Sequence, residues 1–323
     1  MAHVHGDRQV TVIDNQDENA PNVPELSIVI VCWNNKKYLE PCLESLYGAG
    51  LETTFDVVLI DNGSSDGTPA MVEEKFPQVQ LIKNDGNVGL SRASNQGIKA
   101  TQGRCVLLLN DDTIVNARSL DTMVRFMADH RDAGAVGGIL LNPDGTLQAG
   151  YGDFSNLWQE FMIATRLGML ISPAYPNHGR DDQPRQVGWL GSACLLVRRA
   201  ALEQIGLLAE DYFIYGDEAD LQYRLQQCGW KVYYVPGVTT IHYGGRSLDR
   251  WRRRRMVYRG KMLFYRKNYG EPAALALRVM MGALSLGKLA LWGLAWPLPG
   301  WRQRADREVK SNVDILRACW KLE

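Results

Sequence analysis

The sequence predicts an α/β fold in which a mostly parallel central sheet carries helices on both faces and a helical extension follows at the C-terminal side. From Leu26 onward, short apolar runs rich in β-branched residues alternate with stretches of helical spacing. The runs are continuously apolar, which is typical of strands buried on both faces. After about residue 246 the composition turns basic and apolar, which predicts the extension.

The elements can be placed in chain order. Strands are expected over 26–32, 55–60, 79–82 and 104–109, with helices over 38–47, 68–76 and 91–101. The segment 137–186 is expected to be mostly irregular around a helix at 158–170. Helices near 199–205 and 218–228 and a short strand at 231–235 should follow. A basic helix over 246–267 and an apolar stretch over 273–296 complete the pattern.

Length and composition indicate an ordinary globular protein with three parts. Its 323 residues include 46% hydrophobic and 22% charged side chains, which excludes a mainly disordered or fibrous chain. We expect a flexible polar leader at 1–24 without a signal peptide, a catalytic domain at 25–247 and an extension at 248–323. The six cysteines form no CxxC pair, so free buried thiols in a reducing, cytoplasmic compartment are expected.

Charge is balanced overall and uneven along the chain. The 36 basic and 36 acidic side chains cancel, so composition gives no sign of a nucleic-acid partner. Residues 246–310 hold 16 Lys and Arg against 4 Asp and Glu, a local net charge of +12. This excess favours contact with an anionic membrane surface, although a solvated helix face would also explain the arginines at 252–255. The apolar stretch contains Arg278 and Lys288, so a helix on a membrane surface or against the body is favoured over a spanning one.

Polar side chains follow three of the predicted strands. Asn110, Asp111 and Asp112 follow the strand at 104–109, Asp61 follows the strand at 55–60, and Trp33-Asn34-Asn35 follows the strand at 26–32. In parallel sheets, ligands bind beyond the carboxyl ends of the strands. Carboxylates there suit Mg²⁺ or Mn²⁺, and Asp61 could accept hydrogen bonds from a ribose or base. Helix caps and turns are the alternative interpretation of the same residues.

A helix N-terminus and an acidic cluster provide further candidates. Gly89 opens a predicted helix whose N–H groups could bind phosphate, although the sequence has neither a P-loop nor a GxGxxG motif. Asp217, Glu218 and Asp220 lie at the start of another helix, where a general base or simple helix-dipole stabilisation would account for them. His242 is a metal ligand only if a second ligand lies near it.

Seven segments, taken in order, resemble the inverting family 2 glycosyltransferases of the GT-A type, especially rhamnosyltransferase-like bacterial members. They are spread over about two thirds of the chain, roughly residues 26–247, and lie at 26–34, 57–68, 87–97, 108–113, 189–199, 216–221 and 241–245. The resemblance implies a Rossmann-like GT-A domain and a nucleotide-sugar site made of Cys32, Trp33, Asn34, Asp61, Asn87, Gly89, Arg92, Asn95, Asn110 and Asp111.

The resemblance also implies the remaining roles. Asp112 and His242 would hold Mg²⁺ or Mn²⁺, and Trp189, Gly191 and Asp220 would line the acceptor side. Glu218 stands where the family has its catalytic base, usually an Asp that follows Glu or Asp. The order Asp217-Glu218 departs from that pattern and leaves Asp217 as the other candidate.

The expected enzyme therefore transfers rhamnose or another hexose from a dTDP- or UDP-linked donor. The acceptor would be a hydroxyl of a glycan or lipid-linked glycan, reached by a peripheral protein at the inner face of the cytoplasmic membrane. Two alternatives stay open: a sugar-nucleotide nucleotidyltransferase and a catalytically inactive carbohydrate-binding scaffold. The first usually has a glycine-rich loop after its first strand, where this chain has Trp33-Asn34-Asn35-Lys36-Lys37.

Overall fold

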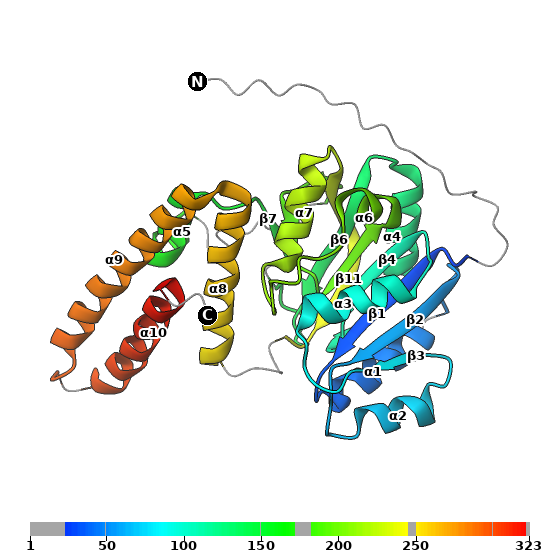
Figure 1. Ribbon diagram of the computed structural model, residues 1–323, viewed down its shortest axis with the longest axis horizontal. Coiled ribbons are helices and arrows are strands. Elements are labelled where there is room, and N and C mark those ends of the chain that lie inside the picture. Colours follow the sequence, from blue (N-terminus) through cyan, green and yellow to red (C-terminus); the bar gives the residue numbers. More distant parts are fainter. Residues whose placement is uncertain are drawn as a thin grey trace.

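The described part of the chain forms a sheet domain with a helical lobe beside it (Figure 1). The computed structural model describes residues 23–48, 50–148, 150–171, 182–244, 250–298 and 300–320. In the helix that begins at Arg250, the side chains are described from Arg253 onward. The leader expected at 1–24 lies almost entirely outside these residues. The α/β fold class with a mostly parallel sheet and added C-terminal helices is confirmed.

Nine of the described strands form one sheet in the order β3-β2-β1-β4-β10-β6-β11-β5, with β8 pairing against β11. Its parallel half consists of β1 (Leu26–Cys32), β2 (Phe55–Asp61), β3 (Gln80–Lys83) and β4 (Cys105–Asn110). The other half contains β6 (Ala133–Leu141), β10 (Cys194–Arg198) and β11 (Lys231–His242), with the short β5 (Thr113–Ile114) and β8 (Arg185–Gln186). A separate pair joins β7 (Tyr151–Gly152) to β9 (Trp189–Leu190).

The register of the parallel half brings polar strand ends together. Cys32 pairs with Asp61, and Val31 pairs with Asn110, so β1, β2 and β4 end at one edge. Because parallel strands share their direction, the loops that follow them meet there. The polar residues expected to form a site are therefore neighbours.

Alternating side chains of the buried strands bind a helical layer to each face. Ile28 and Ile30 join a core with α1 (Lys36–Tyr47), α2 (Thr68–Lys75) and α4 (Ala117–Asp129). Val29 points to the other face, which carries α3 (Leu90–Ala100), α6 (Arg199–Ile205) and α7 (Asp217–Gln227). Successive side chains of a strand point to opposite faces of the sheet, so the two faces have separate cores. On the second face α3 approaches closely, since a Cβ at Gly97 would overlap the Val29 side chain.

The helical lobe has its own hydrophobic cluster. It contains α8 (Arg250–Tyr269), α9 (Glu271–Ala295) and α10 (Arg302–Trp320), which pack on one another and on α5 (Leu157–Thr165). Met262, Leu277 and Ile315 are central residues of this cluster, one from each of the three long helices. Gly270 has a φ of +88°, and this left-handed residue separates α8 from α9.

Three regions differ from the expectation. The segment expected to be irregular begins inside β6, a nine-residue strand. Its glycines weaken the strand signal, yet a Cβ at Gly138 would collide with Val238 of the neighbouring strand. The strand expected over 231–235 continues to His242. The helix expected over 158–170 is α5 followed by a 3₁₀ turn, η1 (Leu167–Leu170).

Candidate active site

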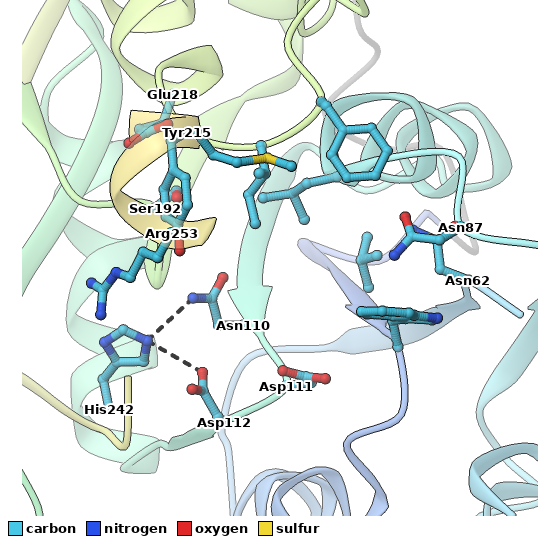
Figure 2. Close-up of a pocket in the computed structure, with 16 residues that line it drawn as sticks. Asn62, Asn87, Asn110, Asp111, Asp112, Ser192, Tyr215, Glu218, His242 and Arg253 are labelled. Carbon is cyan, nitrogen blue, oxygen red and sulfur yellow. Dashed lines mark hydrogen bonds and ion pairs between the residues drawn. The ribbon is translucent and has the colours of Figure 1, made fainter. Parts of the chain in front are cut away.

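A cavity of about 320 Å³ lies at the edge where β1, β2 and β4 end. We call it the sheet-edge cavity. Strand ends, the segment before α7 and helix α8 all contribute to its wall, as Figure 2 shows. Its lining residues include Trp33, Asn62, Asn87, Asn110, Asp111, Asp112, Ser192, Phe213, Tyr215, Glu218, His242, Arg253 and Met256.

One end of the sheet-edge cavity carries Asn62 and Asn87 (Figure 2). Asn62 Nδ2 lies 3.4 Å from Asn87 Oδ1, and the backbone N–H of Asn62 donates to Cys32 O at 2.8 Å. Asp61 lies directly before Asn62 and is buried; it does not itself line the sheet-edge cavity, and its Oδ1 has no hydrogen-bond partner among the described residues. A buried carboxylate oxygen without a partner is costly, so this atom is suited to accepting a ligand's hydroxyl or N–H group.

Asn34 fastens the loop after β1 to the loop after β2. Its φ of +51° turns the chain, its N–H donates to Ser64 Oγ at 2.8 Å, and its Oδ1 accepts from Ser65 N at 2.7 Å. Asn residues tolerate this backbone region better than most. Asn34 is therefore positioned to shape the site, while Cys32 is buried beneath it.

Asn110, Asp111 and Asp112 lie where β4 ends. Asp111 is buried and accepts a hydrogen bond from Asn35 Nδ2 at 2.9 Å. Burial, and then the neighbouring Asp112 carboxylate, raise the pKa of Asp111 to about 7. The Asp112 side chain points instead toward His242, with 3.2 Å between Oδ1 and Nε2 (Figure 2).

Gln148 fixes the orientation of His242. Its amide nitrogen donates to His242 O at 2.5 Å and to Asn142 Oδ1 at 2.8 Å, so its Oε1 faces His242 Nδ1 at 2.9 Å. Because Oε1 only accepts, Nδ1 of the neutral ring carries the proton and Nε2 keeps its lone pair. That lone pair faces Asp112 and Asn110, whose Nδ2 is 3.3 Å away.

This arrangement fits a divalent cation that has two protein ligands. A carboxylate oxygen and an imidazole lone pair face each other, and the Gln148 amide holds the ring. Among the described residues no group of three or more His, Cys, Asp and Glu could hold a metal. Mg²⁺ and Mn²⁺ sites of this kind take their other ligands from substrate phosphates and water. The donor set is thus suited to a metal that arrives with a phosphorylated substrate.

The N-terminus of α3 is covered by a later segment. A Cβ at Gly89, where φ is +92°, would collide with Phe213, and Leu90 N donates to Phe213 O at 2.7 Å. Arg92 forms an ion pair with Glu210 at 3.0 Å, and Asn95 Nδ2 donates to Leu208 O at 2.9 Å. Neither Arg92 nor Asn95 lines the sheet-edge cavity; both hold this segment in place, and their expected contact with the donor stays a prediction.

Asp217 and Glu218 have opposite surroundings at the start of α7. Asp217 is buried, and burial followed by the neighbouring Glu218 raises its pKa well above that of an ordinary aspartate. Glu218 faces the cavity and accepts a hydrogen bond from Gly216 N at 3.0 Å. Burial thus suits Asp217 to stay neutral, whereas the Glu218 carboxylate is open to the cavity.

A second cavity, of about 280 Å³, also borders Glu218. We call it the aromatic cavity, because Phe154, Trp189, Tyr215, Phe264 and Tyr265 line it. Its charged pair is Lys261 and Glu160, which are 2.6 Å apart, with Glu160 buried. Tyr215 and Glu218 line both cavities.

The three residues expected on the acceptor side lie in different places. Trp189 lines the aromatic cavity, and Gly191 lies in the loop behind it, donating to Gly150 O at 2.7 Å. Asp220 is buried and accepts from Arg224 Nε at 2.9 Å and from Asn268 Nδ2 at 3.0 Å. It lines neither cavity, so an acceptor contact by Asp220 stays a prediction.

Arg253 of α8 is a site residue that the sequence analysis did not identify. It lines the sheet-edge cavity, with its guanidinium carbon 6.0 Å from the centre of the Tyr215 ring. The run of arginines at 252–255 indicated a basic helix, but it did not indicate that this helix reaches the sheet-edge cavity. Gly260 explains the reach, since a Cβ there would collide with Tyr215 O.

Comparison with solved structures identifies the fold. The chain superposes on a mannosyltransferase from Pyrobaculum calidifontis solved with GDP-Man and Mn²⁺, with a TM-score of 0.58, 15% identity, and coverage of 94% of this chain and 89% of that one. It also superposes on GalNAc-T7 solved with UDP, GalNAc and Mn²⁺, with a TM-score of 0.56, 19% identity, and coverage of 76% and 50%. The fold is the GT-A fold of glycosyltransferases.

Sequence comparisons identify the family. The profile of glycosyl transferase family 2 matches residues 27–206. An N-acetylglucosaminyl-diphospho-decaprenol L-rhamnosyltransferase of Mycobacterium tuberculosis is 32% identical over 242 residues, which are 70% of this chain and 78% of that protein. The O-antigen biosynthesis protein RfbC of Myxococcus xanthus is 26% identical over 69% of this chain and 18% of its own length. The chain belongs to glycosyl transferase family 2 and is a rhamnosyltransferase-like glycosyltransferase.

Proposed function

We propose that this enzyme moves a hexose, with L-rhamnose as first choice, from a nucleoside diphosphate to a hydroxyl of a lipid-linked glycan, with inversion. The observation that carries the proposal is the position of Glu218. It lines both cavities, across the sheet-edge cavity from Asp112 and His242 (Figure 2). A donor in one cavity and an acceptor in the other would meet at this carboxylate.

The sheet-edge cavity would hold the donor. The partnerless Asp61 oxygen, together with Trp33 and Asn62, suits the base and ribose end. Asn87 and the backbone at Gly89 would border the same end, and Asn110 and Asp111 the sugar. Arg253 would face the diphosphate, since it lies beside His242 (Figure 2). A cation at this position offsets phosphate charge.

Asp112 and His242 would hold Mg²⁺ or Mn²⁺. When bound, the ion stabilises the negative charge that develops on the departing diphosphate. His242 would ligate through Nε2, which the Gln148 contact leaves as the acceptor. The structural neighbours solved with Mn²⁺ support this assignment.

Glu218 would act as general base. Its carboxylate takes the proton of the acceptor hydroxyl while that oxygen forms a bond to the anomeric carbon. The bond from that carbon to the diphosphate oxygen breaks, and its electron pair leaves with the diphosphate. Attack from the side opposite the leaving group inverts the configuration. Asp217, held neutral by burial, would support the charge on Glu218 by hydrogen bonding.

The aromatic cavity would hold the acceptor. Aromatic side chains pack against the apolar faces of sugar rings, and Trp189 is the member of this set that the sequence analysis assigned to the acceptor. The mycobacterial relative's name supports a sugar attached to a polyprenyl diphosphate as the acceptor class. A dTDP-linked rhamnose is the first donor to test and a UDP-linked hexose the second. A lipid-linked acceptor would require work at the inner face of the cytoplasmic membrane.

Family membership favours transfer over the nucleotidyltransferase alternative. Calorimetry and thermal shift with dTDP-rhamnose and UDP-hexoses, each with and without Mn²⁺, should identify one donor that raises the melting point. That donor should then glycosylate a sugar linked to a short isoprenoid diphosphate. Donor binding without turnover on any such acceptor would support the inactive scaffold, and formation of a nucleotide sugar from nucleoside triphosphate would support the nucleotidyltransferase.

A further inference from the structure

Helix α9 turns its charged side chains inward. Arg278 and Lys288 are its charged residues between Pro272 and Ala295. Lys288 Nζ donates to Ala164 O of α5 at 2.6 Å, and two buried guanidinium nitrogens of Arg278 have no hydrogen-bond partner in the described part of the chain. A surface helix of a water-soluble domain has the reverse arrangement, with charges outward and apolar residues inward.

The outward face of α9 is an apolar stripe. Its positions recur every three or four residues, and Leu286 and Leu294 are 60% and 78% exposed. None of the described exposed positions from Pro272 to Ala295 is charged. The stripe consists of Leu275, Val279, Ala283, Leu286, Ala290 and Leu294. We call it the α9 face.

A neighbouring segment adds to the apolar surface. α5 packs beside α9, and the turn η1 that follows it exposes Leu170 and Ile171. Trp158, at the start of α5, is 66% exposed. Scattered apolar residues are normal on a protein surface, but neighbouring elements that expose many of them mark an interaction site.

Tryptophans and arginines gather where α9 leads into α10. The guanidinium carbon of Arg302 lies 4.5 Å from the centre of the Trp296 ring, and that of Arg304 lies 5.3 Å from Trp292 and 5.6 Å from Trp301. Tryptophan and arginine together are typical of the boundary between lipid headgroups and acyl chains. Because residues 246–310 around these side chains also carry a net charge of +12, an anionic bilayer is the favoured occupant.

The neighbours of α9 show how the helix would meet a bilayer. By length and composition α9 could cross a membrane, with a mean hydropathy of 1.6. However, α8 and α10 pack against it, and α10 exposes Arg302, Arg304 and Arg307 to solvent (Figure 1). A spanning α9 would carry these arginines into hydrocarbon, which is unfavourable for a charged side chain. An orientation in the membrane plane avoids that cost.

We propose that α9 lies in the plane of an anionic bilayer, with the α9 face among the acyl chains and the exposed arginines of α10 at the headgroups. Residues 246–310, with a net charge of +12 from 16 basic and 4 acidic residues, complement anionic lipid. The inference deepens the proposed function, because α5 and α8 beside α9 also line the aromatic cavity. A lipid-linked acceptor would thus be held close to its site.

Flotation of the full chain with vesicles tests this surface. Binding is expected to vesicles of phosphatidylcholine and phosphatidylglycerol, and to weaken when phosphatidylglycerol is omitted. Leu286→Glu combined with Leu294→Glu should lower the partition coefficient by about a hundredfold or more, since each leucine loses its transfer free energy. Leu147→Glu, at a 46% exposed site away from the helical lobe, is the matched control and should bind like the wild type.

Two further measurements, the depth of the tryptophans in the bilayer and the dimerisation of the chain, distinguish membrane binding in the plane from the other possibilities. Lipids brominated near the headgroup should quench tryptophan fluorescence more strongly than lipids brominated at the chain ends. Stronger quenching by the deep bromines, or equal binding by the double variant, would overturn the proposal. The proposal would also be overturned if the wild-type chain formed a dimer and bound no vesicles while the double variant stayed monomeric. In that case a second copy of the chain would cover α9. Donor affinity is also measured without vesicles. A failure of membrane binding can then be distinguished from a failure of the proposed transferase activity.

Discussion

The sheet-edge cavity and the aromatic cavity meet at Glu218 but are built in different ways. The first has its wall at the ends of β1, β2 and β4, where short runs of neighbouring residues supply the polar groups. The second is assembled from α5, β9, α7 and α8, whose lining residues are spread over more than a hundred positions of the chain. A cavity at strand ends can be inferred from local patterns, whereas one between helices depends on how those helices dock.

Their electrostatics differ as well. The sheet-edge cavity gathers Asp111, Asp112, His242 and Arg253, as a site for a metal and a diphosphate requires. In the aromatic cavity Lys261 and Glu160 neutralise each other in a largely buried pair. The comparison indicates a charged ligand on one side of Glu218 and a largely uncharged ring on the other. Four variants can break or sharpen this division.

The largest effect is expected from Glu218→Gln. Loss of the proton acceptor should lower turnover by about 10²–10⁴. Donor affinity should stay within about twofold, since the diphosphate end of the cavity is unchanged. Calorimetry and a transfer assay measure the two quantities. Glu203→Gln, on the exposed side of α6, is the control. Wild-type turnover in Glu218→Gln would remove this residue from the base role.

Gly260→Leu tests whether α8 must touch the Tyr215 segment. A side chain at this position meets Tyr215 O and should push α8 away, which displaces Arg253 and the wall of the aromatic cavity. We expect turnover to fall by about 10–100-fold, comparable to a misplaced positioning group. Gly287→Leu, whose Cβ would meet no atom within 4 Å, is the matched control. Equal activity of the two variants would show that the lobe is not part of the site.

Asp112→Asn should weaken the binding of the donor when the metal ion is present. The affinity measured with Mn²⁺ should drop about tenfold or more, because the amide is a poorer ligand than the carboxylate. With a chelator present, wild type and variant should bind the donor equally weakly. Asp129→Asn, at the exposed end of α4, provides the comparison. An unchanged Mn²⁺ dependence in Asp112→Asn would place the ion elsewhere.

The smallest effect is expected from Asp217→Asn, and it depends on pH. Burial raises the pKa of Asp217, so the folded state binds this proton more tightly than the unfolded state does. The resulting stability is fully present below the unfolded pKa of about 4 and is lost as pH rises through the folded pKa. The asparagine cannot ionise, so its stability relative to wild type should improve with rising pH.

Thermal unfolding between pH 5 and 9 measures this difference. The melting point of Asp217→Asn relative to wild type should rise by about 2–4 °C for each kcal/mol gained. Turnover should fall less than tenfold, because the amide still donates to Glu218. A loss of activity as large as that of Glu218→Gln would make Asp217 the base instead.

The sequence was most informative where function and local structure share the same few residues. The segments at 26–34, 57–68 and 108–113 end strands with polar groups, and their register then brings those groups together. The position of Arg253 depends on the docking of α8 at Gly260, which no local pattern encodes. Arg92 similarly bonds Glu210, 118 residues away, rather than lining the cavity.

The missed strand has a physical explanation as well. β6 contains Gly134, Gly137 and Gly138, which lower its strand propensity, yet the packed sheet needs small residues against Trp230 and Val238. Tertiary packing overrode the local signal there. The inward orientation of Arg278 and Lys288 in α9 is likewise a property of the docked lobe, since the sequence shows only that they interrupt an apolar stretch.

The most direct test of the account is the anomalous scattering of Mn²⁺ in crystals grown with the nucleoside diphosphate of the preferred donor. We expect one strong peak at coordination distance from an Asp112 carboxylate oxygen and His242 Nε2, with the diphosphate bound to it and the base near Asp61. A nucleotide found in the aromatic cavity, or a manganese peak away from both Asp112 and His242, would contradict the division of the site at Glu218.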